Sequence, residues 1–429
     1  MAAVAEIRAV PSGPAGSPAA RAFGDNSEFE LLLTCCACTS RAERVCALLS
    51  HRLNWERLLA LVDHHRVVPQ IYSELSAYPH LVPAELLDTL RSRYRDNARK
   101  TLWFRAELVR VVSYLESARI KALPYKGPAL AQIVYGAVTQ RQFGDLDILI
   151  LPADVPKAKA ALRELGYAPA LDLAPQIEAT YIETGYEYSF GSTHGQNLLE
   201  LQWRILPRFY SVNFDVADLF DRAEKINFGE RSLRTLRPED LLLVLSVHAA
   251  KHVWAQLSWL CDIAQLVNSQ RLDWNAIQWE AKRLGIERIL SLNLLLAHKL
   301  LGSPLPPAIH PRSNCHSEHS EESAVAANRE SADSSCQTRV FEEDRLTAAL
   351  ADEILSIVEN STHYNTESLP YFRLMMRLRE RWQDRARFLW RFTVTPSVSE
   401  WSTVQLSKPL QPLYQVVRLS RLAKRLVCG

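Results

Sequence analysis

Two aspartates stand two residues apart where an apolar run begins, in Asp145-Leu146-Asp147-Ile148-Leu149-Ile150. Side chains at positions i and i+2 of a strand point to the same face, so the two carboxylates are expected to converge while the aliphatic residues alternate into a core. Two like charges that close repel each other unless a proton or a divalent cation lies between them. The run therefore predicts a strand in a buried sheet that carries a metal-binding pair.

A turn with anion-binding features precedes this strand. Lys126-Gly127-Pro128 opens a predicted helix over residues 128–135, and proline is favoured at the first helical position. Gly127 lets a ligand approach the backbone closely, and a helix N-terminus attracts anions. With Lys126 nearby, the turn and the aspartate pair together predict a site for a nucleotide polyphosphate held by magnesium.

The same residues carry a resemblance to a known family. The chain resembles the uncharacterised nucleotidyltransferases of the polymerase-beta-like superfamily in Lys126-Gly127, Tyr135, Arg141, Asp145-Leu146-Asp147 and Leu165-Gly166-Tyr167. Two later patterns are also typical of that family, Lys251-His252-x-Trp254 and Trp259-Leu260-x-Asp262-Ile263.

The resemblance implies transfer of a nucleoside monophosphate from a nucleoside triphosphate, such as ATP, to a hydroxyl on a small molecule, a sugar or a protein. In the superfamily an Asp-x-Asp strand binds two magnesium ions, and a third carboxylate on a neighbouring strand completes the site. Asp145 and Asp147 are the expected bridging ligands. Glu200, the one acid in Leu198-Leu199-Glu200-Leu201-Gln202-Trp203, is the expected third catalytic and metal-binding residue. This chain departs from the superfamily at the phosphate-binding turn, where Lys126-Gly127 replaces the usual Gly-Ser.

Residues with a predicted role in binding the nucleotide are Lys126, Gly127, Arg141, His248, Lys251 and His252. Structural ion pairs of Lys126 and Arg141 with the two aspartates are an equal alternative. The two histidines, Lys251 and Asp262 form either a polar layer that holds the base or the acceptor, or a set of buried hydrogen bonds between helices. Zinc on His248 and His252 is disfavoured, because Ala249 replaces the glutamate of the metalloprotease motif.

The remaining pattern predicts an α+β protein with a small mixed sheet flanked by helices. Residues 155–165 predict a helix, and residues 186–190 and 198–203 predict a hairpin. Apolar positions three and four residues apart predict a long helix over residues 84–119 and another that begins at Pro238 and runs towards Trp254.

These elements suggest a division of the chain into six parts. They are a disordered leader (1–27), an N-terminal helical region (28–118), a nucleotidyltransferase core (119–236), a second helical region (237–311), a disordered insert (312–339) and a basic helical C-terminal region (340–429).

Bulk properties set looser limits. The chain has 429 residues, 48% hydrophobic and 23% charged, and its net charge of +2 neither favours nor excludes a polyanionic partner. No apolar run reaches the roughly 18 residues of a membrane-spanning helix, and the leader lacks the basic start and apolar core of a signal peptide, so a cytoplasmic location is expected. The eight cysteines are scattered, and the CxxC at Cys35 and Cys38 has no second pair with which to bind zinc.

Arginines recur through the predicted C-terminal helices. Amphipathic basic helices can bind nucleic acid or anionic lipid, although Glu380 and Asp384 interrupt the run and an ordinary solvated face is the alternative. The basic residues are Arg373, Arg377, Arg379, Arg381, Arg385, Arg387, Arg391, Arg418, Arg421, Lys424 and Arg425. Two further functions therefore stay open beside the transferase: a degenerate nucleotide-binding or scaffold subunit without catalysis, and an RNA-modifying nucleotidyltransferase, with nucleic acid the less favoured partner.

Overall fold

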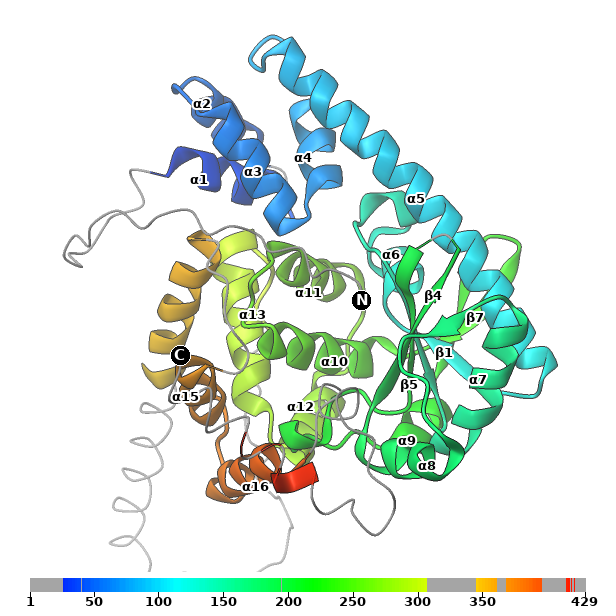
Figure 1. The fold of residues 1–429 in the computed structure, drawn as a ribbon. Coiled ribbons are helices and arrows are strands. Elements are labelled where there is room, and N and C mark those ends of the chain that lie inside the picture. The colour runs from blue at the N-terminus through cyan, green and yellow to red at the C-terminus, as the bar shows by residue number, and fades with distance from the viewer. Residues whose placement is uncertain are drawn as a thin grey trace, which may run out of the picture.

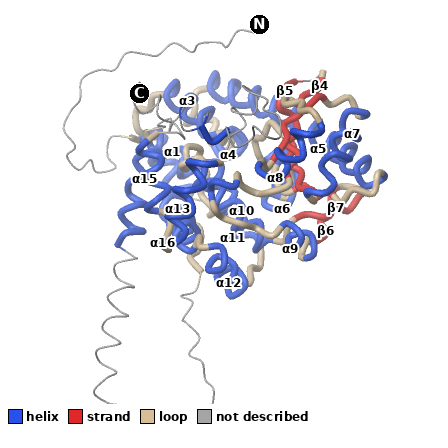
Figure 2. The backbone as a smooth tube through the Cα atoms, turned by 60° about the horizontal axis from the view of Figure 1, so that its bottom comes forward, coloured by secondary structure: helices blue, strands red, loops and turns tan. Residues whose placement is uncertain are grey.

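The computed structural model describes residues 26–39, 41–193, 195–306, 345–360, 368–395, 414–416, 418 and 420. The predicted leader, apart from its last two residues, and the whole predicted insert lie outside these described residues. The α+β class is confirmed, because helices surround one small mixed sheet that lies towards one side of the molecule (Figures 1 and 2).

The elements have the following bounds. The helices are α1 (Ser27–Cys35), α2 (Ala42–Leu49), α3 (Trp55–His65), α4 (Val68–Leu75), α5 (Ala84–Ser117), α6 (Gly127–Tyr135), α7 (Val155–Glu164), α8 (Pro175–Thr184), α9 (Val216–Asp221), α10 (Pro238–Lys251), α11 (Leu257–Ser269), α12 (Trp274–Leu284), α13 (Glu287–Leu301), a helix over residues 345–359, α15 (Leu369–Arg377) and α16 (Trp382–Val394). The strands are β1 (Ala122–Pro124), β2 (Leu146–Ile150), β3 (Ala168–Pro169), β4 (Glu187–Ser192), β5 (Gly195–Gln202), β6 (Glu224–Phe228) and β7 (Arg231–Thr235).

The main sheet has the strand order β1-β2-β5-β4-β3. β2 and β5 pair in parallel, whereas the other neighbours are antiparallel. All five residues of β2 are buried, which explains why its sequence is an apolar run broken only by Asp147. The parallel register places Asp147 directly opposite Glu200, so the carboxylates of two separate motifs meet at the centre of the sheet.

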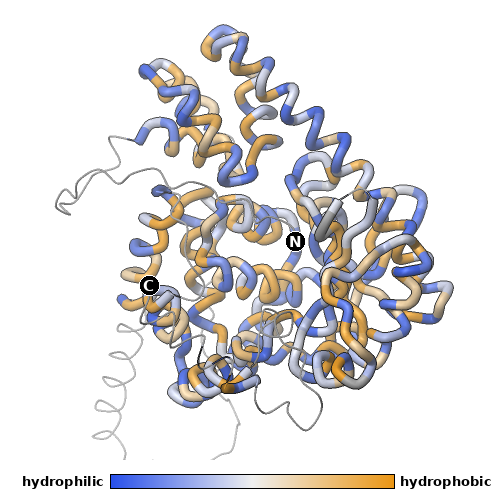
Figure 3. Tube along the Cα trace, in the orientation of Figure 1, coloured by the Kyte–Doolittle hydropathy of each residue, from blue (hydrophilic) through white to orange (hydrophobic). Residues whose placement is uncertain are grey.

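Two apolar clusters fill the interior. One joins α1–α4 to α10, α11, α13 and the C-terminal helices, and the other lies between the sheet, α7 and the second half of α5. The 34-residue helix α5 belongs to both, with Leu90 in the first cluster and Leu108 in the second. Figure 3 shows the difference between the largely hydrophobic α10, α11 and α13 and the alternating hydropathy of α5. The division of the chain into domains stays a prediction.

The predicted elements around the site are confirmed. The helix expected over residues 128–135 is α6, the one expected over residues 155–165 is α7, and the long helix expected over residues 84–119 is α5. The expected hairpin is the antiparallel pair β4 and β5.

The helix that begins at Pro238 ends earlier than expected. It stops at Lys251, and Val253 and Trp254 then adopt left-handed backbone angles, with φ of 53° and 51°. This conformation is unfavourable for a β-branched residue such as valine, so tertiary contacts must hold it. The buried Trp254 indole donates a 2.8 Å hydrogen bond to Asn293 Oδ1 of α13, which anchors the turn between α10 and α11.

Two residues of the predicted basic C-terminal face, Arg379 and Arg418, are buried. Arg379 lies between α15 and α16, is 2% exposed, and donates a 2.6 Å hydrogen bond to the carbonyl of Tyr210. Its guanidinium carbon lies 4.4 Å from the centre of the Phe388 ring, and burial lowers the pKa of Arg379 to about 10. The expectation of a surface role is therefore wrong for Arg379. It is also wrong for Arg418, which is 3% exposed and donates a 2.7 Å hydrogen bond to the carbonyl of Phe392. Arg421, Lys424 and Arg425 lie outside the described residues.

The structure also bears on the cysteines and on membrane-spanning helices. Among the described residues, Cys35, Cys36, Cys38, Cys46 and Cys261 are free thiols. Within the same part of the chain, every helix is too short or too polar to cross a bilayer.

Candidate active site

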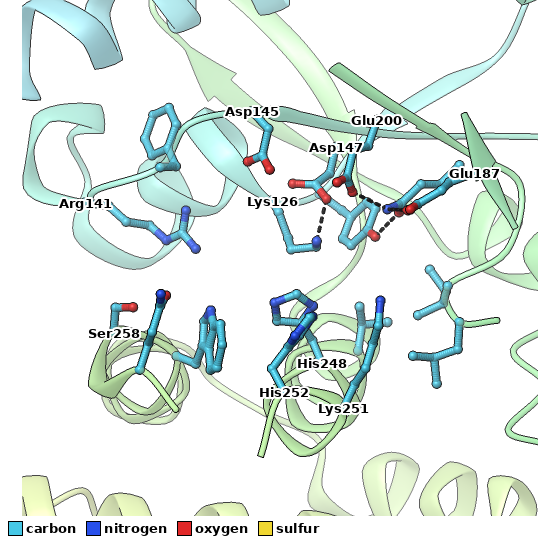
Figure 4. A pocket seen from close by; sticks show the side chains of 18 of the residues that line it. Lys126, Arg141, Asp145, Asp147, Glu187, Glu200, His248, Lys251, His252 and Ser258 are labelled. Atoms are coloured by element: carbon cyan, nitrogen blue, oxygen red, sulfur yellow. Dashed lines mark hydrogen bonds and ion pairs between the residues drawn. The ribbon is translucent and has the colours of Figure 1, made fainter. Parts of the chain in front are cut away.

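Three acidic side chains gather at the adjacent strands β2 and β5. Asp147 and Glu200 are register partners, and Asp145 stands two residues before Asp147 at the entrance to β2. All three line one cavity of about 380 Å³, and Figure 4 shows their carboxyl groups side by side along its upper wall. The convergence predicted from the two-residue spacing and from the apolar strand at Glu200 is therefore present in the fold.

The opposite wall of the cavity is helical. His248, Lys251 and His252 project from the end of α10, and Ser258 comes from the start of α11 (Figure 4). Trp259, the next residue of α11, also lines the cavity. The early end of α10 and the left-handed turn after it bring these two helix ends together beneath the acids.

Lys126 lies between the two walls and forms an ion pair with Asp147 (Figure 4). The side chains are 12% and 3% exposed, so the pair is shielded from water. Burial alone would lower the pKa of Lys126, but the charge of Asp147 raises it above its ordinary value. For Lys126 the structural ion pair with an aspartate of the motif is confirmed.

Arg141 lines the cavity but pairs with a different acid. Its Nε lies 3.0 Å from both carboxylate oxygens of Asp262 on α11, and its Nη2 lies 2.9 Å from Oδ2. The Tyr135 hydroxyl donates a further hydrogen bond of 3.1 Å to the same carboxylate. The alternative in which Arg141 pairs with the aspartates of β2 is wrong, because a helix 121 residues away in the sequence supplies its partner.

Gly127 is required by a contact inside the fold. It has a φ of 52°, and a Cβ built on it would lie 2.8 Å from the carbonyl oxygen of Asp145. A side chain here would therefore push the start of α6 away from the aspartate segment. The close approach expected between Gly127 and a ligand is thus made, in this structure, by the backbone of Asp145.

A hydrogen-bond network fixes the third acid. The Gln202 amide, two residues after Glu200 on the same face of β5, donates to Glu200 Oε2 at 2.9 Å and to Glu187 Oε2 at 3.1 Å. The buried Tyr125 hydroxyl donates to the amide oxygen of Gln202. Glu187, on β4, is thereby a fourth carboxylate facing the cavity.

The acids of the cavity lie close enough to raise one another's pKa values. Burial and then the charge of Asp147 raise the pKa of Asp145, while burial, Glu187 and Asp147 raise the pKa of Glu200 to about 8. Carboxylate oxygens that repel one another are the donors that Mg²⁺ prefers, so the residue chemistry fits a hard divalent cation. Among the described residues no three acidic, histidine or cysteine side chains stand at ligand positions around one point, and the Lys126 ammonium lies on Asp147.

The helical wall of the cavity presents two imidazole rings, an indole ring and the amine of Lys251. The rings of His248 and His252 lie 5.4 and 5.3 Å from that of Trp259, between centroids, and the Lys251 ammonium lies 5.1 Å from the centre of the Tyr186 ring. Burial is the main cause that lowers the pKa of His248 well below its ordinary value and that of His252 to about 3. Burial also lowers the pKa of Lys251. Both imidazoles are therefore neutral at physiological pH and can donate or accept a hydrogen bond.

Sequence reasoning gave no site role to many of the residues that line the cavity. The ones that bear most on its chemistry are Arg66, Tyr125, Glu187, Gln202 and Trp259. Two of these carried a usable signal, since Gln202 is two residues from Glu200 on a strand and Glu187 alternates with tyrosines on the neighbouring strand. The others enter the site through tertiary contacts.

We expect Glu200→Gln to remove a pH dependence of stability from the metal-free protein. With its pKa raised to about 8, against about 4.3 in an unfolded chain, Glu200 holds a proton in the folded state that the unfolded state has lost. Wild-type stability should therefore fall as pH rises between these values, by up to about 1.4 kcal/mol per pH unit, and stop falling above the folded pKa. The free energy of unfolding is measured by urea denaturation in EDTA from about pH 6.5 to about pH 9. This range is chosen because the buried histidines change the stability mainly below it. A wild-type-minus-variant difference that stays constant over this range would contradict the assignment.

Comparisons with known proteins add a family similarity. A family model described as an uncharacterised nucleotidyltransferase matches residues 51–302, a span that includes every predicted site residue. A crystal structure of an antigenic nucleotidyltransferase-like protein from Paracoccidioides brasiliensis aligns at 14% sequence identity, over 46% of this chain and 92% of that chain, with a TM-score of 0.28. A structural similarity that low supports no inference about this chain. No curated protein matches the sequence.

Proposed function

Because the chain belongs to the family of uncharacterised nucleotidyltransferases, we propose that it transfers a nucleoside monophosphate from a nucleoside triphosphate to a hydroxyl acceptor. One observation carries the proposal: Asp145, Asp147 and Glu200 face a single cavity from neighbouring strands, with Asp147 opposite Glu200. Binding of a nucleotide alone would not require three acids beside the phosphates, since carboxylates repel them.

Asp145, Asp147 and Glu200 would hold the magnesium ions, in the proposed assignment. When bound, two such ions lower the pKa of the acceptor hydroxyl and neutralise the charge that develops on the leaving pyrophosphate. Glu200, whose carboxyl group Gln202 fixes, would hold the ion on the acceptor side or, once a bound cation has displaced its own proton, take the proton of the acceptor hydroxyl.

The cationic and aromatic residues would position the substrates. Lys126, at the start of α6, and Arg66, on the rim, can bind phosphate oxygens. Arg141 would act through Asp262 and Tyr135 by keeping α6 and α11 together, since its guanidinium is already engaged. Trp259, flanked by neutral histidines, offers a flat surface on which a base can stack.

A nucleotide-binding subunit without catalysis is the second candidate, and one observation favours it. The ion pair of Lys126 with Asp147 places an amine where a metal ion would otherwise bind. If the pair were permanent, the pocket would bind a nucleotide without a catalytic metal. The RNA-modifying alternative depended on the basic C-terminal helices, and burial of Arg379 and Arg418 removes two members of that face.

Label transfer tests the proposed function. The purified protein is incubated with magnesium, cell extract and each nucleoside triphosphate in turn, labelled at either the α- or the γ-phosphate. The proposal predicts label on an acceptor from the α-labelled compound only, and dependence of that label on Asp145. Nucleotide binding without any such transfer would favour the non-catalytic subunit, and γ-label on the acceptor would instead indicate a kinase.

A further inference from the structure

We propose that Lys126 is an internal counter-ion, which pairs with Asp147 in the free protein and moves to the phosphates of the incoming nucleotide. The site would then accept the metal ion and the nucleotide together and exclude either one alone. This inference rests on the proposed function and concerns the form of its substrate, the metal–nucleotide complex.

The first step of the argument is competition for one carboxylate. Lys126 Nζ contacts Oδ1 of Asp147, and both side chains are almost fully enclosed. Asp145 and Glu200 also contribute to the electrostatic stabilisation of this ammonium. A divalent cation bound by the same three acids would meet the ammonium at short range, and like charges at short range in a shielded site repel strongly.

The second step is the freedom of Lys126 to move. Lysine carries a single compact charge on a flexible stem, and Lys126 immediately precedes the first helical residue of α6, where backbone amides favour an anion. By contrast, Arg141 is held by two carboxylate oxygens of Asp262 and is not available for exchange. Lys126 is therefore the cation that, by moving, frees Asp147 of the aspartate pair and brings its ammonium to a phosphate, whereas Arg66 and Lys251, which also line the cavity, do not form the ion pair with Asp147.

The third step is the balance of charge. A nucleotide that enters alone meets the carboxylates of Asp145, Asp147 and Glu187, which oppose its phosphates, while the ammonium at the start of α6, Lys126, is paired with Asp147. A metal ion that enters alone meets Lys126 on Asp147. When both enter, the ammonium pairs with phosphate and the metal with the acids, so each ligand relieves the repulsion that opposes the other. Such mutual relief is positive coupling between two binding events.

The first arm of the test measures Mn²⁺ affinity without nucleotide, from the signal of free Mn²⁺ in electron paramagnetic resonance. Lys126→Met removes the ammonium and keeps the side-chain length, and Lys126→Gln is a second variant of different polarity. Both are expected to bind Mn²⁺ about tenfold or more tightly than the wild type. Lys121→Met, an exposed lysine on the same segment, is the matched control and should leave the affinity unchanged.

The second arm measures nucleotide affinity without metal, by calorimetry in EDTA with a non-hydrolysable α,β-methylene triphosphate. Asp147→Asn releases Lys126 and should tighten binding by about tenfold. Asp145→Asn removes the same charge two residues away but leaves the ion pair, and should tighten binding less. This arm does not require any Lys126 variant to fold.

The two failures can be told apart. Mn²⁺ affinity of both Lys126 variants equal to or below that of the wild type would overturn the counter-ion proposal, as would equal gains for Asp145→Asn and Asp147→Asn. The proposed function would survive either result if the wild type still binds Mn²⁺ together with the triphosphate analogue. Absence of binding by the wild type with both ligands present would overturn the two proposals together.

Discussion

Asp145→Asn is expected to lower nucleotidyl transfer by about 10³-fold or more while the protein stays folded. The substitution removes a metal-binding oxygen and a negative charge but changes the shape of the side chain little. Burial and repulsion by Asp147 raise the pKa of Asp145, so its ionised form is disfavoured in the folded state. A neutral amide should consequently leave the free energy of unfolding unchanged or slightly higher.

The measurement is the initial rate of α-label transfer, with denaturant unfolding of the same preparation. Asp221→Asn is a suitable control, because this exposed aspartate at the end of α9 makes the same chemical change outside the cavity. Full activity of Asp145→Asn would remove this residue from the metal site. An equal loss of activity and stability would show that the substitution disrupts the fold instead.

Arg141→Met is expected to destabilise the protein by about 3–5 kcal/mol, because it leaves the buried Asp262 carboxylate without its cation. Asp262 is 1% exposed and accepts hydrogen bonds from Arg141 and Tyr135. The same ion pair connects the segment before β2 to α11, so its loss also loosens the contact between the two walls of the cavity.

The double variant Arg141→Met with Asp262→Leu separates charge from packing. It removes both charges and should recover most of the lost stability, since a buried ion pair replaced by apolar groups of similar size is often nearly neutral. Guanidinium unfolding of the wild type, both single variants and the double variant gives the coupling energy. Additive losses in the double variant would contradict a tight ion pair.

The sequence was sufficient to predict the acids and the elements that carry them. Asp145 and Asp147 share a face because the period of a strand is two, and their apolar neighbours could only belong to a buried sheet. The family resemblance implied that the strand of Glu200 neighbours the aspartate strand, and the single acid among apolar residues selected it, although the register, Asp147 opposite Glu200, required the structure. Start and stop residues such as Pro128 and Gly166 set the bounds of α6 and α7.

The partners of the charged residues could not be predicted in the same way. Arg141 pairs with Asp262, and Tyr125 donates a hydrogen bond to Gln202. In both pairs the partners are distant in the sequence, and local periodicity does not select one acid or amide over another. The early end of α10 depends on Trp254, whose hydrogen bond to Asn293 stabilises a backbone that valine and tryptophan otherwise avoid. Tertiary contacts therefore determine these partners and the end of α10, whereas the local sequence pattern determines the strands and helices that carry the acids.

The most direct test of the central claim is a crystal structure with Mn²⁺ and the α,β-methylene triphosphate, with the metal located from its anomalous signal. The assignment predicts Mn²⁺ bound by Asp145, Asp147 and Glu200, with Lys126 moved from Asp147 to a phosphate oxygen. A bound nucleotide with Lys126 still paired to Asp147, and no metal at these acids, would contradict the account.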